Sequence, residues 1–416
     1  MSKRARVLGW TLIGLLPVAI LLAAEGTVRL LRISPRFERD AALPPWLDRN
    51  ILVKDAAWME MLSRAPRELK SYYSTYEWDR YLFYRLRPNL SIPLTDLLAP
   101  PGIRERTRWT LRTNSRGFPG RDVPYGPHPG VFRIVCLGDS STFGWGVESD
   151  EAYPARLEAE LRSRHPALPI EVVNLGVCGY SSFQGRILLD REALRYEPDA
   201  VTLSYGSNDW SPVPEPFDAA YRRNAGWNGA VKAVLNRSRA YQIYAAFLTR
   251  ALAGREREAI EEIRSGTSGM PLNVGPEESE RNLEAMMDRV RAAGADPILV
   301  TNCVPGEMAD PVRAAARAAG APLVDTGALL AAAIEDVAAG KVDPSGRART
   351  VSTYREGALR EHPDLEVYLA DGCHPNPIGH RILARAVADA IESAPGFRRA
   401  AGAPLDPVAG EARGPL

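Results

Sequence analysis

The chain has 416 residues, 45% of them hydrophobic and 25% charged, which is enough to bury a sizeable core and to hold more than one domain. Its 52 basic and 51 acidic residues leave a net charge of +1, so no basic footprint points to nucleic acid, and no nucleic-acid partner is expected. The four cysteines form no Cys-x-x-Cys pair, which argues against a cysteine-ligated metal site.

Residues 1–32 are expected to form an N-terminal membrane anchor. Basic residues at 3, 4 and 6 precede the uncharged run 7–24, which approaches the roughly 20 apolar residues that a membrane-spanning helix needs. A cleaved signal peptide has a similar layout, and a buried helix is a third reading, but the run is long for a signal core and lacks a good cleavage site. Because basic residues flank both ends, the positive-inside rule does not set the orientation. We expect the part of the chain that follows this segment to lie outside the cytoplasm, in the periplasm or at the cell surface.

Residues 33–130 form an accessory or linker region, rich in proline, arginine and aromatic residues. Its aromatic cluster is expected to be a small packing unit on the main domain, with a glycan or lipid contact surface as the alternative. Residues 107–113 alternate as a strand does, and 124–130 resemble a linker. The cluster comprises Tyr72, Tyr73, Tyr76, Trp78, Tyr81, Phe83 and Tyr84.

From residue 131 onward, apolar runs alternate with stretches of helical periodicity. This order predicts an α/β domain over 131–393, in which a parallel sheet is covered on both faces. The insertion 211–276 interrupts the alternation and is either a lid or substrate wall, or a solvated structural excursion. Residues 394–416 are rich in proline, glycine and alanine and are expected to be disordered. The apolar runs lie at 131–137, 170–175, 200–205, 297–301 and 322–324.

Four short motifs follow the apolar runs or precede helices, so that a parallel sheet would gather them where its strands end. A serine hydroxyl needs a base within hydrogen-bonding reach. Among five histidines, only His374 lies on a loop between an apolar segment and a helix with a carboxylate three residues earlier. Asp371 can therefore hold one ring nitrogen of His374 while the other faces Ser140. The motifs are Gly138-Asp139-Ser140, Asn174-x-Gly176-x-x-Gly179, Gly206-Ser207-Asn208-Asp209 and Asp371-x-x-His374.

Acyl-ester hydrolysis also needs hydrogen-bond donors where the oxyanion develops. The Ser140 amide, the Gly179 amide and the Asn208 side chain are the candidates, although a turn glycine and a loop cap are the ordinary readings of the last two. Asp139 is expected to cap the following helix and to brace the loops, and Asp209 to have a similar structural role. The remaining histidines, His128, His165, His362 and His380, lie in linkers, in loops or inside a helix, where structural roles are the default.

The cysteines allow two readings. Cys136, in the first core strand, is expected to be a small buried hydrophobe. Cys178 and Cys373 lie inside two of the motifs, and Cys303 ends a strand that points the same way. Two of these could form a disulfide in an oxidising compartment, but free buried thiols are favoured, because sequence does not supply the geometry that a disulfide requires.

These motifs resemble the four sequence blocks of the SGNH (GDSL-type) hydrolases over residues 131–393. The resemblance implies a flavodoxin-like three-layer α/β/α fold, a Ser140–His374–Asp371 triad, and an oxyanion hole of Ser140, Gly179 and Asn208, with no metal and no cofactor. The anchor and the Arg-Thr-Asn-Ser-Arg-Gly-Phe segment at 112–118 are similar to bacterial membrane-tethered members. Two departures stand out: Ser141 replaces the leucine that the family name implies, and a cysteine precedes His374.

The expected function is that of a membrane-anchored serine hydrolase acting on carboxylic esters. By the family resemblance, O-acetyl or other short acyl groups on a carbohydrate are the expected substrate. Transfer of the acyl group to a sugar would use the same residues, and a lipase or thioesterase acting on longer chains is a further alternative. A metal-dependent phosphoesterase would need several histidine ligands, and a catalytically silent binding module would leave Ser140 unreactive.

Overall fold

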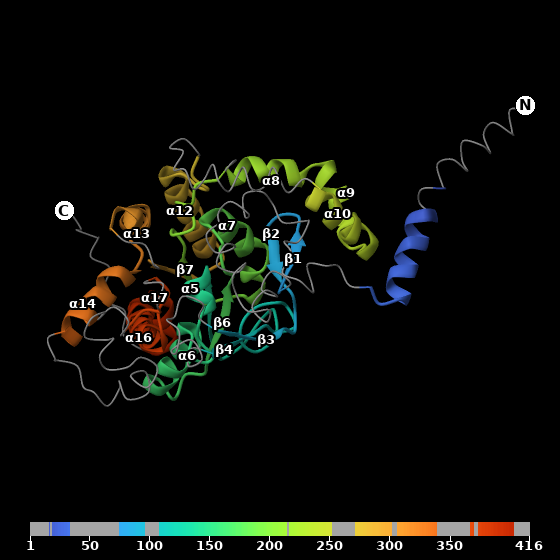
Figure 1. The fold of residues 1–416 in the computed structure, drawn as a ribbon. Coiled ribbons are helices and arrows are strands. Elements are labelled where there is room, and N and C mark those ends of the chain that lie inside the picture. The colour runs from blue at the N-terminus through green and yellow to red at the C-terminus, as the bar shows by residue number, and fades with distance from the viewer. Residues whose placement is uncertain are drawn as a thin grey trace, which may run out of the picture. The chain divides into compact units, whose positions relative to one another are not determined.

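The computed structural model describes residues 16, 19–33, 75–95, 108–213, 216–251, 271–301, 306–338, 367–369 and 373–402. The chain divides into two compact units. Unit 1 comprises Met1–Leu86 and Pro212–Pro271, and unit 2 comprises Arg87–Ser211 and Leu272–Leu416. The two units are described separately below (Figure 1).

Unit 2 is built on a parallel five-stranded sheet with the strand order β6-β5-β7-β8-β9. Each of the five apolar runs in the sequence forms one of these strands, which confirms the α/β prediction. Strand β5 is buried along its whole length, as expected for a strand covered on both faces. The strands are β5 (Phe132–Gly138), β6 (Ile170–Gly176), β7 (Ala200–Ser204), β8 (Asp296–Val300) and β9 (Leu323–Val324).

The register of the sheet brings the ends of three strands together. Gly138, the last residue of β5, pairs with Gly176 of β6 and with Ser204 of β7. All three strands therefore end at the same level of the sheet. The loops that follow them carry the first three sequence motifs, so the register alone gathers these motifs at one edge.

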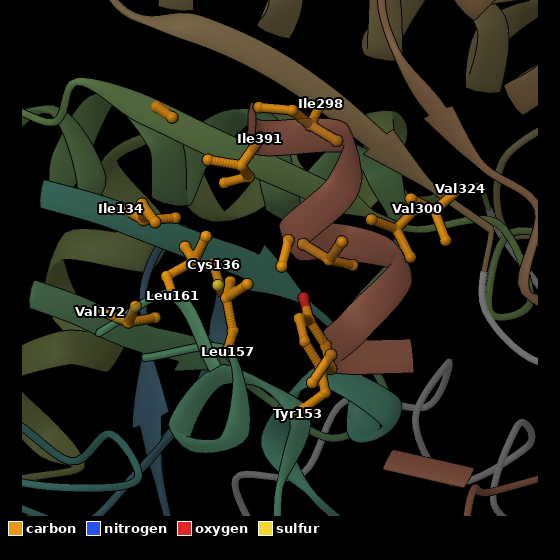
Figure 2. Close-up of a cluster of buried hydrophobic side chains, with 14 of the residues drawn as sticks. Ile134, Cys136, Tyr153, Leu157, Leu161, Val172, Ile298, Val300, Val324 and Ile391 are labelled. Carbon is orange, nitrogen blue, oxygen red and sulfur yellow. The ribbon is translucent and has the colours of Figure 1, made fainter. Parts of the chain in front are cut away.

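Helices pack against both faces of this sheet. Alternate residues of β5, Ile134 and Cys136, lie in a buried cluster with side chains of α6 and α16 (Figure 2). Their neighbours Val135 and Leu137 are equally buried and face the other side, because side chains alternate along a strand. The helices of unit 2 are α5 (Ser140–Phe143), α6 (Tyr153–Arg164), α7 (Ser182–Arg191), α12 (Pro276–Ala292), α13 (Asp310–Ala319), α14 (Thr326–Ala338), α16 (Pro377–Ser393) and α17 (Pro395–Ala400), with 3-10 turns at Ala193–Tyr196 and Gly306–Ala309.

The C-terminal residues differ in part from the prediction of disorder over 394–416. Residues 395–400 form α17, and the Phe397 ring is 1% exposed. It contacts the rings of Phe132 and His165 at centroid distances of 5.0 and 4.9 Å. Burial of one aromatic side chain thus orders this segment against β5 despite its proline- and glycine-rich composition. Residues 403–416 lie outside the described residues.

The accessory region 33–130 is divided between the two units. The hairpin of β3 (Ser91–Thr95) and β4 (Arg108–Arg112) belongs to unit 2, where Arg112 forms an ion pair of 2.9 Å with Glu148. The hairpin of β1 (Tyr76–Asp79) and β2 (Phe83–Leu86) belongs to unit 1. The alternation noted at 107–113 therefore corresponds to a strand of unit 2.

Unit 1 combines the β1–β2 hairpin with three helices of the insertion, α8 (Phe217–Ala225), α9 (Trp227–Leu235) and α10 (Arg239–Ala251). Phe83 stacks on Phe217 with ring centroids 4.7 Å apart, and Arg80 donates hydrogen bonds to three carbonyl groups where α8 ends. The aromatic cluster seen in the sequence thus packs on the insertion; Tyr72 and Tyr73 lie outside the described residues.

The N-terminal part of unit 1 is a helix over residues 19–30. Only a few residues of the expected span 7–24 are among the described residues. No helix in the described part of the chain combines the length and the apolar character needed to cross a membrane.

Candidate active site

The first motif forms a tight turn between β5 and α5 that presents Ser140. A Cβ atom on Gly138 would lie 2.0 Å from Thr142 Oγ1 and 2.9 Å from the Ser204 carbonyl oxygen, so only glycine fits at the end of the strand. The Asp139 side chain then caps the short helix by accepting a hydrogen bond from the Ser141 amide at 3.0 Å. The end of β5, Gly138 and the Asp139 cap together fix the position of Ser140, which is the first residue of α5.

His374 lies directly against Ser140. Its Nε2 atom is 2.7 Å from Ser140 Oγ, a distance at which a neutral imidazole nitrogen can accept the hydroxyl proton. The backbone holds the histidine in place, because the Leu369 amide donates to the His374 carbonyl at 2.8 Å. Just beyond, Asn376 caps α16 by accepting hydrogen bonds from two backbone amides. The structure thus brings together two residues that are 234 positions apart.

The neighbouring Ser141 is differently placed. It is 4% exposed, whereas Ser140 is half-buried. The hydrogen bond to His374 comes from Ser140, so the geometry favours Ser140 as the nucleophile. Asp371, the predicted third member of the triad, lies outside the described residues and stays a prediction.

Gly179 follows β6 on the loop that passes the end of β5. Its φ of +81° is in the left-handed region, which glycine adopts without the cost that a side chain would bring. The loop is attached to the turn that presents Ser140, because the Val177 amide donates to the Gly138 carbonyl at 3.1 Å. Gly179 is therefore on the loop next to the strand that presents Ser140.

Asn208 links the three strand-end loops. Its side-chain Nδ2 donates to Asp139 Oδ2 at 2.9 Å and to the Tyr180 carbonyl at 3.2 Å. These two bonds use both hydrogens of the amide, so a developing oxyanion would have to share or displace one of them. The hydrogen bond to Tyr180 is the longer of the two, so we expect an oxyanion to displace this bond and not the one to Asp139.

Asp139 and Asp209 both brace the site, which confirms their expected structural roles. The Asp139 carboxylate is 1% exposed and its Oδ2 also accepts a hydrogen bond of 2.9 Å from Ser207. Asp209 is fully buried and accepts hydrogen bonds from the Ser182 amide at 2.8 Å and from the Ser279 hydroxyl at 2.6 Å. Asp139 therefore ties α5 to the β7 loop, and Asp209 ties that loop to α7 and α12.

Two tryptophans beside the site have no counterpart among the residues predicted from sequence. The half-buried Trp145 ring lies 6.4 Å from the His374 ring, between centroids. Trp109 of β4 packs edge-on against Trp145 at 5.0 Å and against Phe143 at 6.4 Å. Nothing in the local sequence pairs residue 109 with the turn that presents Ser140, because the contact depends on where the β3–β4 hairpin packs within unit 2.

A second histidine, His380, is buried one turn into α16. Its Nδ1 accepts a hydrogen bond of 3.2 Å from the Tyr153 amide, and within the described part of the chain its Nε2 has no hydrogen-bond partner. Burial, together with the nearby His374 and Arg156, lowers the pKa of His380 to about 3. It is thus a neutral packing residue, as the sequence interpretation expected, and not a second base.

The cysteines follow the sequence interpretation in part. Cys136 and Cys178 are free and buried, and burial raises the pKa of the Cys136 thiol to about 12, which makes it unreactive. Cys373, next to His374, is disulfide-bonded, so the preference for a free thiol was wrong at this position, because the fold supplies a geometry that sequence alone does not. Cys303 lies outside the described residues. Among the described residues, no cluster of three metal-ligating side chains is present.

A model of the GDSL-like lipase/acylhydrolase family matches residues 136–382, a range that contains Ser140, Gly179, Asn208 and His374. No curated protein matches the chain.

Three solved structures illustrate the similarity. The psychrotrophic esterase EstA from Pseudoalteromonas sp. is 15% identical, with a TM-score of 0.35 over 63% of this chain and 97% of its own. A lipase/acylhydrolase from Enterococcus faecalis is 17% identical, with a TM-score of 0.35 over 62% and 95%. A catalytic mutant of an acetylxylan esterase from Geobacillus stearothermophilus is 17% identical, with a TM-score of 0.34 over 62% and 93%.

Proposed function

Because the chain belongs to the GDSL-like lipase/acylhydrolase family and is an ester-hydrolysing enzyme, we propose that Ser140 is its nucleophile and His374 its general base. The observation that carries the proposal is the 2.7 Å contact between Ser140 Oγ and His374 Nε2. It is the contact through which a base activates a weak hydroxyl nucleophile.

The proposed reaction has two steps. His374 takes the hydroxyl proton as Ser140 Oγ attacks the ester carbonyl, and it returns the proton to the departing alkoxide, which leaves as an alcohol. Water, deprotonated by the same histidine, then attacks the acyl-enzyme, and His374 returns that proton to Ser140 Oγ as the carboxylic acid departs and ionises in solvent. Asp371 is the proposed partner that orients the His374 ring.

The oxyanion would be held by the amides of Ser140 and Gly179 and by the Asn208 side chain. The Ser140 amide is in the first turn of α5, where backbone N–H groups have no carbonyl partner within their own helix. Asn208 is fixed beside the nucleophile turn by Asp139. Loss of one such donor typically costs about 10²–10³ in kcat.

We propose an O-acetyl or other short acyl ester of a carbohydrate as the substrate. Support comes from Trp145, whose half-buried ring lies beside His374 and is held by Trp109. A fixed aromatic surface next to the base can pack against the apolar face of a sugar ring, much as aromatic side chains in ligand sites do.

The proposal includes attachment to a membrane through residues 1–32 and a catalytic unit outside the cytoplasm. The disulfide at Cys373 supports this location, because disulfides persist mainly in oxidising compartments. The apolar side chains of the helix over 19–30, which are exposed along most of its length, support the attachment.

A fluorophosphonate probe tests the assignment of the nucleophile. We expect the wild type and the Ser141→Ala control to be labelled and Ser140→Ala to remain unlabelled, with kcat reduced on the order of 10⁶ in Ser140→Ala. Labelling of folded Ser140→Ala, or its absence from Ser141→Ala, would contradict the proposal. Rates on short acyl esters, long-chain esters and acetylated glycans then test the substrate, and a strong long-chain preference would refute the acetyl-ester assignment.

A further inference from the structure

Exposed apolar side chains are concentrated in unit 1. Among the described residues, every large apolar side chain that is exposed belongs to this unit, with the single exception of Met308. Some of them lie on the N-terminal helix, and the others lie on α9 and α10 of the insertion. Scattered exposed apolar residues are normal on a soluble protein, whereas a concentration of them in one part marks an interaction surface.

On α9 and α10 these side chains follow helical spacing. Trp227, Val231 and Val234 are separated by four and three residues and therefore share one face of α9, and Tyr244 and Phe247 share a face of α10 in the same way. The Trp227 ring is 81% exposed and that of Phe247 is 70% exposed. We call these five residues the exposed apolar face.

The local packing of unit 1 fixes this face outward. Gly229 of α9 is buried, and a Cβ atom there would lie 1.6 Å from the Asn224 carbonyl oxygen. The side of α9 that carries Gly229 therefore sits directly on the end of α8. Arg80 of the β1–β2 hairpin holds the same joint by donating to the carbonyls of Asn224, Ala225 and Gly226.

The segment that contains α9 and α10 is positively charged. Residues 219–255 contain seven lysine or arginine residues and no aspartate or glutamate, although the whole chain carries a net charge of only +1. Arg223 of α8 and Arg237, between α9 and α10, are exposed, and the exposed Arg222 pairs with Asp218 at the start of α8. Exposed apolar side chains on amphipathic helices, with basic residues close by in the chain, are the combination found in segments that lie in the interface of a membrane, and basic residues favour anionic lipids.

The N-terminal helix contacts the same segment. Glu25 accepts hydrogen bonds of 2.8 Å from the Ser238 hydroxyl and 2.9 Å from the Ala240 amide, at the start of α10. A carboxylate is favourable at a helix N-terminus. The exposed apolar face is thus joined, within unit 1, to the segment for which membrane attachment is proposed above.

We propose that α9 and α10 lie on the surface of an anionic lipid bilayer, with the exposed apolar face inserted into the interfacial layer and the basic residues at the level of the headgroups. The insertion is then a membrane-contact element of the protein, a role that does not depend on the chemistry of Ser140. It rests in part on the proposed membrane attachment, and the experiment separates the two.

The test places an environment-sensitive nitrobenzoxadiazole fluorophore on the full-length protein through Val231→Cys, with Met308→Cys as the matched control on unit 2. Cys136 and Cys178 are buried, and the wild type labelled in parallel gives the background from native cysteines. Each protein is mixed with vesicles of phosphatidylcholine, alone or with phosphatidylglycerol, and co-flotation, emission wavelength and iodide quenching are measured.

We expect a blue shift and loss of iodide quenching at position 231 with phosphatidylglycerol vesicles, a smaller change with phosphatidylcholine alone, and no change at position 308. Absence of co-flotation would overturn both the attachment and this proposal. Co-flotation with position 231 still open to iodide would overturn this proposal alone. Protection of position 231 without vesicles that grows with protein concentration would show that a second copy covers the face, and would also overturn it.

Discussion

Replacing Asp139 with asparagine should separate positioning of the oxyanion hole from general stability. In the wild type, Asp139 Oδ1 accepts from the Ser141 amide, and Oδ2 accepts from Ser207 and from Asn208. Asparagine can keep its oxygen toward Ser141 and preserve the helix cap. Its NH₂ group then faces Ser207, whose hydroxyl can rotate to accept, and the Asn208 amide, which can only donate.

The substitution therefore loses one hydrogen bond to a charged group. Such a bond contributes about 1.5–3 kcal/mol to stability, so the free energy of unfolding should fall by about that amount. If Asn208 supplies an oxyanion donor, its displacement should lower kcat by about 10²-fold, with a smaller change in KM. Urea unfolding and steady-state kinetics on a short acyl ester measure the two effects.

Asp209→Asn is the comparison variant. It removes the charge of a similarly buried carboxylate next to Asn208 on the loop after β7, whose partners Ser182 and Ser279 belong to α7 and α12. We expect it to lose stability while retaining most of the wild-type kcat. Equal losses of kcat in both variants, or wild-type kcat in Asp139→Asn, would refute the positioning role of Asp139.

Two further predictions concern His380 and Trp145. Because the pKa of His380 is lowered to about 3 in the folded state and is near 6.5 when unfolded, unfolding takes up a proton between these values. The free energy of unfolding should therefore fall as pH drops below about 6.5, at up to about 1.4 kcal/mol per pH unit. His380→Asn should show a shallower decline in urea titrations at each pH, and an unchanged slope would contradict the assignment. Trp145→Ala should raise KM for an acetylated glycan more than for a small acetyl ester, and equal effects on both would argue against contact with a sugar ring.

Much of the catalytic unit is predictable from sequence because its signals are local. A strand that is covered on both faces needs apolar residues along its whole length, and such a run is visible in the sequence without knowledge of the fold. Each of the five runs forms a strand of the sheet. Parallel strands that end in register bring the motifs after them together, so the meeting of Ser140 with His374 follows from the order of elements and from the elimination of the other histidines. Asp371 remains a prediction.

Contacts between distant segments could not be read from local patterns. Trp109 reaches the site because the β3–β4 hairpin packs beside Trp145 within unit 2. Phe397 orders α17 because its ring packs against those of Phe132 and His165. The disulfide at Cys373 depends in the same way on where the chain places its sulfur.

The strands, the order of the motifs and the proposed pairing of Ser140 with His374 could be predicted from the sequence, because each depends on neighbouring residues or on how few residues of one type the chain contains. The three-dimensional structure was needed to show that the β1–β2 hairpin belongs with the insertion, and that the Asn208 amide donates to both Asp139 and Tyr180. These features arise from packing between segments more than a hundred residues apart or from the geometry of one side chain, and neither leaves a periodic trace in the sequence.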